Sequence, residues 1–313
     1  MVLAAVAALM VAAHEIAPRP GHPPTRDLRG PAVPPTDPTG WELPESHETD
    51  DGVVRWARLG TGGHPVVLVH GTPYSSFLWR DVAPALARTR TVYVFDLLGY
   101  GRSDRHEGQD LTLAAQARRF AGLLDHWGLT APSVVANDIG GAVVLRAHLL
   151  ESARYRDLTV FDAVSGGRWE RGLFQLMREH PEVFAALPGY AHEALVAAHL
   201  RNASHRGLHP DVLEAHLAPW RGPEGQAAFY RQYRQLAEAD TRPYEHLLDT
   251  ITVPVRLLWG RHDRILPPEY GVWLHERIPH STLHWFDDAG HLLQEDRPAE
   301  LTAHLLDPPP PRA

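Results

Sequence analysis

The sequence contains no cysteine and no lysine. Without cysteine, the protein cannot form disulfides, thiolate nucleophiles or cysteine-ligated metal sites. Without lysine, it cannot form a Schiff base through a lysine or use a phosphate-loop lysine. The 30 basic residues are therefore all arginine, and against 38 acidic residues they give a formal net charge of −8 with histidine neutral. This balance argues against binding to nucleic acid or to a membrane surface.

The sequence also lacks an apolar run long enough to cross a bilayer. Residues 2–13 resemble the apolar part of a signal peptide, but no basic stretch precedes them. We therefore expect a cytoplasmic protein, with export as the alternative. Prolines crowd residues 18–40 and 308–311, which predicts an apolar stretch and linker over residues 1–40 and a proline-rich tail over residues 308–313.

Short apolar or β-branched runs alternate with helical patterns along most of the chain. The strand-like runs are Val53–Leu59, Pro65–Val69, Thr91–Phe95, Ser133–Ala136, Leu158–Phe161, Val253–Trp259 and Thr282–Phe286. Helical spacing covers Ser76–Ala87, Leu111–Trp127, Ile139–Leu150 and Ala299–Leu306. Continuous apolar runs are typical of parallel strands that are covered on both faces. The pattern predicts an α/β fold with a mostly parallel, doubly wound sheet.

The alternation stops between about residues 166 and 248, where strand signals are weak. This block has helical patterns over Leu173–His180, His192–Asn202, Pro210–His216 and Gly225–Ala239. We predict a helical lid over residues 166–248, inserted between core segments 41–165 and 249–307. Ligands bind at the carboxyl ends of parallel strands, so the lid would cover the pocket of a small-molecule substrate.

Chemically reactive residues follow the predicted strands. The strand ending at Ala136 is followed by NDIGG and then a helix, which is the pattern of a nucleophile elbow with Asp138 at its tip. A later strand is followed by GRHD, which ends at Asp263, and the last strand by DAGH, which ends at His291. The order of nucleophile, acid and histidine is that of α/β-hydrolases.

Three further segments carry a family resemblance over about residues 41–307: HGTPYSSFLWR at 70–80, DLLGYGRSD at 96–104 and AGHLLQEDRP at 289–298. The chain resembles the α/β-hydrolases that use an aspartate nucleophile, such as haloalkane dehalogenases and epoxide hydrolases. The resemblance implies an α/β-hydrolase fold with Asp138 as nucleophile, His291 as base and Asp263 as acid. Asp162, at the end of the Leu158–Phe161 strand, is the alternative acid.

A carboxylate at the elbow favours attack on an sp3 carbon, because attack on an ester or amide would give an anhydride. The product is an alkyl-enzyme ester, which His291 would hydrolyse by activating a water molecule. The backbone N–H groups of Thr72 and Ile139 would form the oxyanion hole. The histidines show no metal-ligand spacing and no dinucleotide motif is present, so we expect an enzyme without metal or cofactor.

Two positions depart from the haloalkane dehalogenases, which hold the halide with a tryptophan after the nucleophile and an asparagine in the His-Gly-Asn-Pro segment. Ile139 and Thr72 stand there, and for this reason we expect epoxide opening ahead of dehalogenation. Lid residues would contact the substrate: Tyr230 and Tyr233 at the epoxide oxygen, or Trp169 or Trp220 at a halide. A biosynthetic cyclase or ring-opening enzyme of the same fold, and a non-catalytic binding relative, remain as alternatives.

Overall fold

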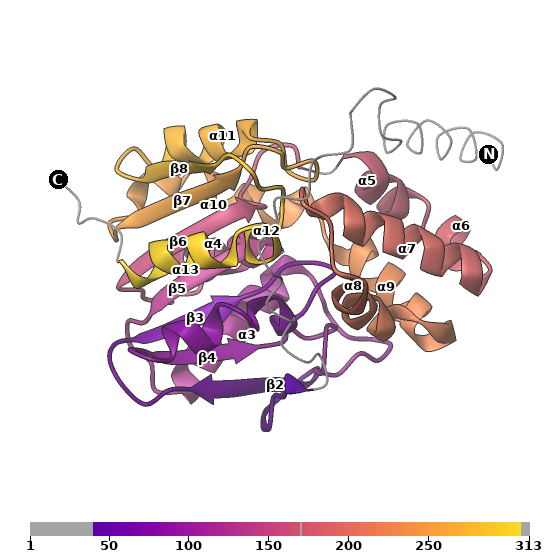
Figure 1. The fold of residues 1–313 in the computed structure, drawn as a ribbon, viewed down its shortest axis with the longest axis horizontal. Helices are drawn as coiled ribbons and strands as arrows, with labels where there is room; N and C mark the ends of the chain where they lie inside the picture. Colours follow the sequence, from indigo (N-terminus) through magenta and orange to yellow (C-terminus); the bar gives the residue numbers. More distant parts are fainter. Residues whose placement is uncertain (1–39, 170, 308–313) are drawn as a thin grey trace.

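The sheet has eight strands in the order β1-β2-β4-β3-β5-β6-β7-β8 (Figure 1). The computed structural model describes residues 40–169 and 171–307, so the predicted N-terminal stretch (apart from Gly40) and the proline-rich tail lie outside the described residues. The strands are β1 (Glu45–Thr49), β2 (Gly52–Leu59), β3 (Pro65–Val69), β4 (Thr91–Phe95), β5 (Ser133–Asp138), β6 (Asp157–Ala163), β7 (Val255–Gly260) and β8 (Thr282–Phe286). The β1–β2 and β2–β4 pairs are antiparallel, and every other pair is parallel.

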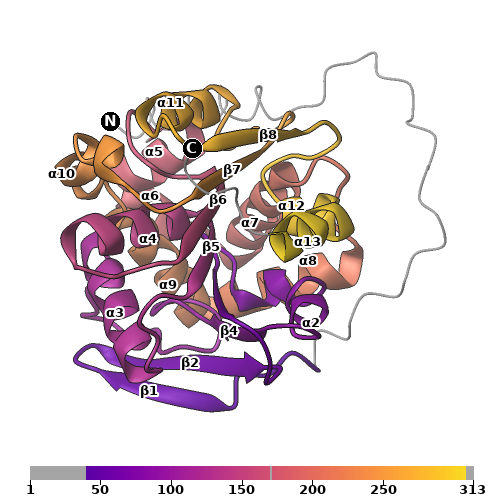
Figure 2. The same cartoon turned by 90° about the vertical axis from the view of Figure 1, so that its left-hand side faces the viewer.

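Helices cover both faces of the sheet, as Figure 2 shows. One face carries α3 (Leu113–His126), α4 (Ile139–Leu150) and α11 (Glu269–Arg277), and the other carries α2 (Ala83–Leu86), α12 (Leu293–Asp296) and α13 (Pro298–Leu306). Alternate residues of β3 therefore enter different cores: Val67 and Val69 pack with the first group, and Val66 and Leu68 with the second. A strand that is buried on both faces has no polar side, which explains its continuous apolar sequence.

The segment between β6 and β7 is helical. Its α-helices are α5 (Gly172–Glu179), α6 (Pro181–Ala185), α7 (Gly189–Ala203), α8 (Pro210–Leu217), α9 (Gly222–Gln235) and α10 (Arg242–Glu245). Helices α5 to α9 gather at one end of the sheet, while α10 lies beside α4 (Figures 1 and 2). We call this segment the lid. Within the described part of the chain, no helix is long and apolar enough to cross a membrane.

The α/β-hydrolase fold and the mostly parallel sheet are confirmed, and the bounds predicted for β3, β4 and β8 coincide with those observed. One strand was missed, and one local prediction is wrong. Strand β1 was not predicted, because its sequence ESHET is polar and lies at the edge of the sheet. Residues 76–87, predicted as one helix, form a 3-10 helix over Ser76–Trp79 and then α2. Pro84 explains the break, because proline is tolerated in the first turn of a helix but not inside one.

Candidate functional site

The turn between β5 and α4 lifts the Asp138 side chain above the sheet edge. Asp138 has φ 53° and ψ −129°, a conformation that non-glycine residues rarely adopt. Small neighbours make room for this turn: a Cβ on Gly71 would lie 2.3 Å from the Asp138 Cβ, and one on Gly141 would lie 2.5 Å from the Ala163 Cβ. Such strain costs about 1–3 kcal/mol and is concentrated at functional sites. The predicted elbow geometry is therefore present.

His291 lies between two carboxylates. Its Nδ1 is 2.9 Å from Asp263 Oδ2, and its Nε2 is 3.3 Å from Asp138 Oδ2. Asp263 is held in turn by the backbone N–H groups of Ile265 and Leu266, which donate to Oδ1 at 2.8 and 2.9 Å. The structure thus brings together the three residues predicted as nucleophile, base and acid, and all three are buried.

The charge of His291 depends on these neighbours. Burial lowers the pKa of the imidazole, but Asp263 and Asp138 outweigh that effect and hold the pKa well above its ordinary value of 6.5. The two carboxylates therefore favour the protonated imidazole in the free protein. Removing the charge of Asp138 would lower the pKa of His291 again, because one of the two stabilising carboxylates would be lost.

The predicted oxyanion hole is occupied by the Asp138 carboxylate itself. The Thr72 N–H donates to Asp138 Oδ1 at 2.7 Å, and Ile139 is the first residue of α4, with its side chain facing the cavity. The loop that carries Thr72 is held by His70, whose Nε2 accepts from the Leu97 N–H and whose Nδ1 donates to the Gly71 carbonyl, both at 2.9 Å. His70 therefore has a structural role.

Asp162, the alternative acid, is in a different environment. It is fully buried at the end of β6, and its Oδ1 accepts from the Gly260 N–H at 2.8 Å. Burial and the nearby Asp263 charge raise the pKa of Asp162 well above its ordinary value. No hydrogen bond joins it to His291 among residues 40–169 and 171–307. The geometry at the imidazole favours Asp263 as the acid.

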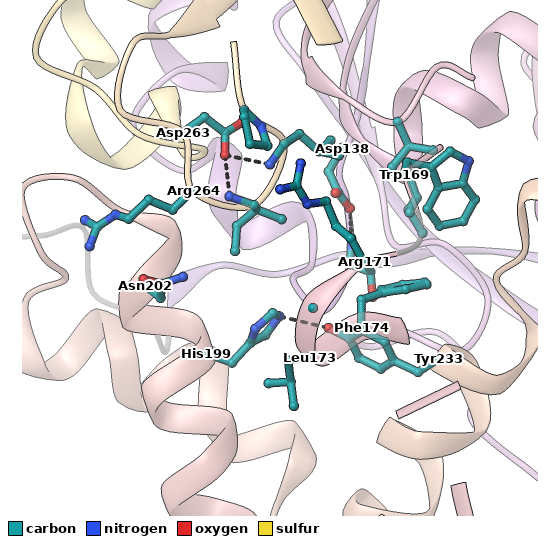
Figure 3. A pocket seen from close by; sticks show the side chains of 17 residues that line it. Asp138, Trp169, Arg171, Leu173, Phe174, His199, Asn202, Tyr233, Asp263 and Arg264 are labelled. Carbon is teal, nitrogen blue, oxygen red and sulfur yellow. Dashed lines mark hydrogen bonds between the residues drawn. The ribbon is translucent and has the colours of Figure 1, made fainter. Parts of the chain in front are cut away.

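A cavity of about 410 Å³ opens over Asp138 (Figure 3). Apolar side chains form most of its wall: Ile139, Val164, Trp169, Leu173, Phe174, Ile265, Leu266 and Pro267. Its polar lining comes from Thr72, Asp138, Arg171, His199, Asn202, Tyr233, Asp263 and Arg264. This volume is within the range of small-molecule sites.

Only two of the four lid residues predicted at the substrate line this cavity. Tyr233 and Trp169 line it, although the Trp169 Nε1–H donates to Thr241 Oγ1 at 3.2 Å. Trp220 and Tyr230 do not line it. Trp220 Nε1–H donates to the Pro73 carbonyl at 2.9 Å, and Tyr230 Oη is 2.9 Å from His192 Nδ1. The first contact joins the lid to the loop after β3, and the second joins α9 to α7, so the structure does not place either residue at the substrate.

A histidine that the sequence did not single out completes the polar wall. His199 Nε2 is 3.1 Å from Tyr233 Oη (Figure 3). Burial, followed by the nearby His291 charge, lowers the pKa of His199 to about 4, while burial raises the pKa of Tyr233 well above 10. Both groups are therefore uncharged at neutral pH. The sequence places His199 on a predicted helix but does not indicate which side of the helix faces Asp138.

The lid and the loop that carries His291 share one buried carboxylate. Asp296 accepts hydrogen bonds from Ser204 Oγ at 2.6 Å and from the backbone N–H groups of residues 205 and 206 at 2.9 and 3.0 Å. It also accepts from the Gly290 N–H at 2.8 Å. The His291 N–H donates to the Ala203 carbonyl at 2.8 Å. The end of α7 is thus fixed directly to the loop that carries His291.

A buried ion pair between Arg80 and Glu295 anchors the segment that follows the His291 loop. Arg80 donates to both carboxylate oxygens of Glu295 at 2.6 and 2.7 Å, and His216 Nε2 is 3.4 Å from Glu295 Oε1. Burial alone would raise the pKa of Glu295, but the hydrogen bonds from Arg80 and His216 outweigh it and lower the pKa to about 2. The pair joins the loop after β3 to α12.

Comparison with known proteins relates this chain to α/β hydrolases. A family model described as "alpha/beta hydrolase fold" matches residues 64–298. A 2-hydroxy-6-oxo-2,4-heptadienoate hydrolase from Pseudomonas putida is 30% identical over 244 residues, which cover 74% of this chain and 84% of that protein. An α/β hydrolase fold protein from Burkholderia ambifaria has a TM-score of 0.82 at 42% identity, covering 85% of this chain and 98% of its own. The epoxide hydrolase CorEH (TM-score 0.67, 22% identity, 84% and 96% covered) shows likeness of fold alone.

Proposed function

The chain belongs to the α/β-hydrolase family, and we propose that it is a cofactor-free hydrolase in which Asp138 opens an epoxide through an alkyl-enzyme ester. One observation carries this proposal. Asp138 lines the same cavity as a pair of uncharged donors, His199 and Tyr233. An epoxide needs these two functions together, a nucleophile at carbon and a donor at oxygen.

In the first step, Asp138 Oδ2 forms a bond to a ring carbon, and the bond from that carbon to the ring oxygen breaks. The oxygen keeps the bonding electron pair and takes a proton from the Tyr233 hydroxyl. His199 can donate its Nε2–H to the tyrosine oxygen, which stabilises the charge that develops there. Because burial raises the pKa of Tyr233, the hydroxyl carries its proton at neutral pH before the reaction.

In the second step, water attacks the ester carbonyl of Asp138 and His291 Nε2 accepts a proton from that water. The ester carries no charge, so the pKa of His291 falls from its value in the free protein. The imidazolium then gives up a proton that restores the Tyr233 hydroxyl, and the neutral imidazole becomes a base. The negative charge that develops on Oδ1 is held by the Thr72 N–H, which already bonds that oxygen at 2.7 Å. Collapse of this intermediate breaks the bond from the carbonyl carbon to Oδ2, which leaves as the second oxygen of the diol and takes the proton of the newly formed carboxyl group. Asp138 is again a carboxylate, and His291 again carries its proton.

The same geometry gives less support to a dehalogenase. A departing halide needs N–H donors, yet the Trp169 indole donates to Thr241 and Ile139 offers no side-chain donor. A non-catalytic relative would need a filled pocket or a displaced histidine, whereas here the cavity is open and His291 contacts both carboxylates. These observations favour an enzyme that acts on an epoxide.

The test is mass spectrometry of a His291→Gln variant exposed to matched epoxides and haloalkanes. If the mechanism is right, the first step proceeds and the second stalls, so an ester accumulates on Asp138. An opened epoxide adds its full mass, whereas a haloalkane adds its mass without the halogen. Asp138→Ala is the control and should stay unmodified. An adduct from haloalkanes alone would replace epoxide opening with dehalogenation, and no adduct from any compound would contradict the covalent mechanism.

A further inference from the structure

We propose that the substrate carries a carboxylate at the end remote from the epoxide, and that Arg264 and Asn202 bind it. This inference rests on the proposed function and adds a substrate class to it. Both residues line the cavity over Asp138. The carboxylate would take hydrogen bonds from the guanidinium and the amide, an arrangement that suits the geometry of both donors.

Arg264 is held by one hydrogen bond and has further N–H donors. It directly follows Asp263, and its Nη2 donates to the Ser204 carbonyl at 3.3 Å, so the guanidinium lies at the carboxyl end of α7. Its side chain is exposed, and no carboxylate among the described residues forms an ion pair with it. A guanidinium has five N–H donors, of which the Ser204 carbonyl uses one.

Asn202 supplies a second donor on the same side. It lies on α7, three residues after His199, and residues with this spacing share a helix face. Figure 3 shows Asn202 and Arg264 on one side of the cavity, Trp169 and Phe174 on the opposite side, and Asp138 between them. The cavity therefore has a polar end and an apolar end, with the nucleophile in the middle.

A second arginine, Arg171, also lines the cavity, and its side chain is 53% exposed. Its ion pair with Glu269 is loose, because the atoms are 3.9 Å apart and the Glu269 side chain is 69% exposed. A pair of this kind contributes less than about 1 kcal/mol, so an entering anion can displace it. Arg171 would attract the substrate, and Arg264 would bind it.

The charges also limit where the carboxylate lies. The carboxylates of Asp138 and Asp263 lie on either side of one imidazole, His291, so an anion placed near the reacting carbon would be repelled. Arg171 and Arg264 add two positive charges at the cavity wall. A carboxylate several carbons away from the epoxide avoids the repulsion and gains the attraction. A carboxylate bonded directly to the epoxide ring would lie near the reacting carbon and would be repelled.

The experiment compares 5,6-epoxyhexanoate with its methyl ester, which has the same chain without the charge. For Arg264→Met, kcat/KM for the carboxylate should fall by about 10- to 100-fold, while kcat/KM for the ester changes by less than about twofold. Arg264→Lys should restore part of the loss. Arg261→Met is the matched control, because Arg261 lies three residues away, is exposed and pairs with Asp287 outside the cavity. It should leave both substrates unaffected.

If Arg264→Met lowered kcat/KM equally for the acid and the ester, the proposal would be overturned, because Arg264 would then serve only to hold the end of α7 in place. A wild-type protein without preference for the acid would overturn it as well. Hexanoate binding, measured by calorimetry, tests the same site without turnover: binding should be lost in Arg264→Met and kept in Arg261→Met. If His291→Gln forms an adduct with the methyl ester but hexanoate does not bind, the carboxylate site fails and the proposed function stands. If hexanoate binds but no epoxide gives an adduct, the proposed function fails instead.

Discussion

The floor and the roof of the cavity hold their polar groups in different ways. In the floor, Thr72, Asp138 and Asp263 line the cavity and His291 lies between the two carboxylates, which backbone N–H groups bind directly. In the roof, formed by α5, α7 and α9, the polar pair His199–Tyr233 depends on how two helices pack against each other. The floor is thus fixed by local loop geometry, and the roof by the arrangement of the lid.

This difference separates the type of reaction from the choice of substrate. The floor supplies what any reaction through an ester on Asp138 requires: a nucleophile, a base and an oxyanion donor. The roof supplies the donors for a leaving oxygen and the groups that would bind the rest of the molecule. Changes in the floor should therefore abolish turnover of every substrate, while changes in the roof should alter the relative rates.

The strongest test of the floor is Asp138→Ala. Without the carboxylate no ester can form, and we expect turnover of every epoxide to fall by about 10⁴-fold or more. Stability should be retained or increased, because the smaller side chain removes buried charge from a strained turn. Steady-state kinetics and thermal unfolding measure the two effects. Residual turnover within tenfold of wild type would show that the floor does not act through Asp138.

The buried Arg80–Glu295 ion pair, which anchors the segment after the His291 loop, is tested by Glu295→Gln. The change leaves buried Arg80 with only the partly exposed Asp81, 3.4 Å away, as a charged partner, and we expect a loss of about 3 kcal/mol in the free energy of unfolding, measured in urea. Glu214→Gln is the matched control: it breaks the exposed Arg221–Glu214 pair and should cost less than about 0.5 kcal/mol. Equal costs would mean that the floor is no more firmly anchored than the surface.

The same ion pair predicts a pH dependence of stability. The pKa of Glu295 is lowered from 4.5 to about 2, so its contribution is complete above about pH 4.5 and is lost as pH falls toward 2. The difference in stability between wild type and Glu295→Gln should therefore shrink over this range. Urea unfolding at several pH values measures it, and a constant difference would contradict the assignment.

The roof is tested by Tyr233→Phe, with Tyr230→Phe as the matched control on the same helix. Loss of the Tyr233 hydroxyl removes the proton donor to the epoxide oxygen, and we expect ester formation to slow by about 10- to 100-fold. Tyr230 bonds His192 outside the cavity, so its variant should react at close to the wild-type rate. Rapid-quench mass spectrometry of the adduct separates this step from hydrolysis. Similar rates for both variants would remove Tyr233 from the chemistry.

The smallest expected effect is a shift in which step limits turnover. Hydrolysis of the ester requires uncharged His291, whereas attack by Asp138 does not. As pH falls, hydrolysis should therefore slow first, and the steady-state fraction of wild-type protein that carries the adduct should rise. Intact-protein mass spectrometry during turnover measures this fraction. A fraction that falls with decreasing pH would contradict the role of His291 as base.

The sequence was sufficient to predict much of the floor, because its residues follow strands whose patterns are local. The positions of Asp138, Asp263 and His291 after β5, β7 and β8 place them at one sheet edge in any fold of this topology. The roof could not be predicted in this way. Tyr230 and Tyr233 point about 60° apart on one helix, and only the packing of α9 against α6 and α7 decides which of them reaches the cavity.

The hydrogen bonds to the Asp296 carboxylate limit which lid segments could replace this one, whether by protein engineering or in evolution. Because it binds both residues 204–206 and Gly290, a helical segment taken from a relative would fit this core only if its chain presents the same N–H groups at the end of α7. A graft that breaks the lid before residue 203 and keeps residues 203–206 would preserve the join. One that replaces those residues would also disturb the histidine loop, and the new specificity would come with a damaged catalyst.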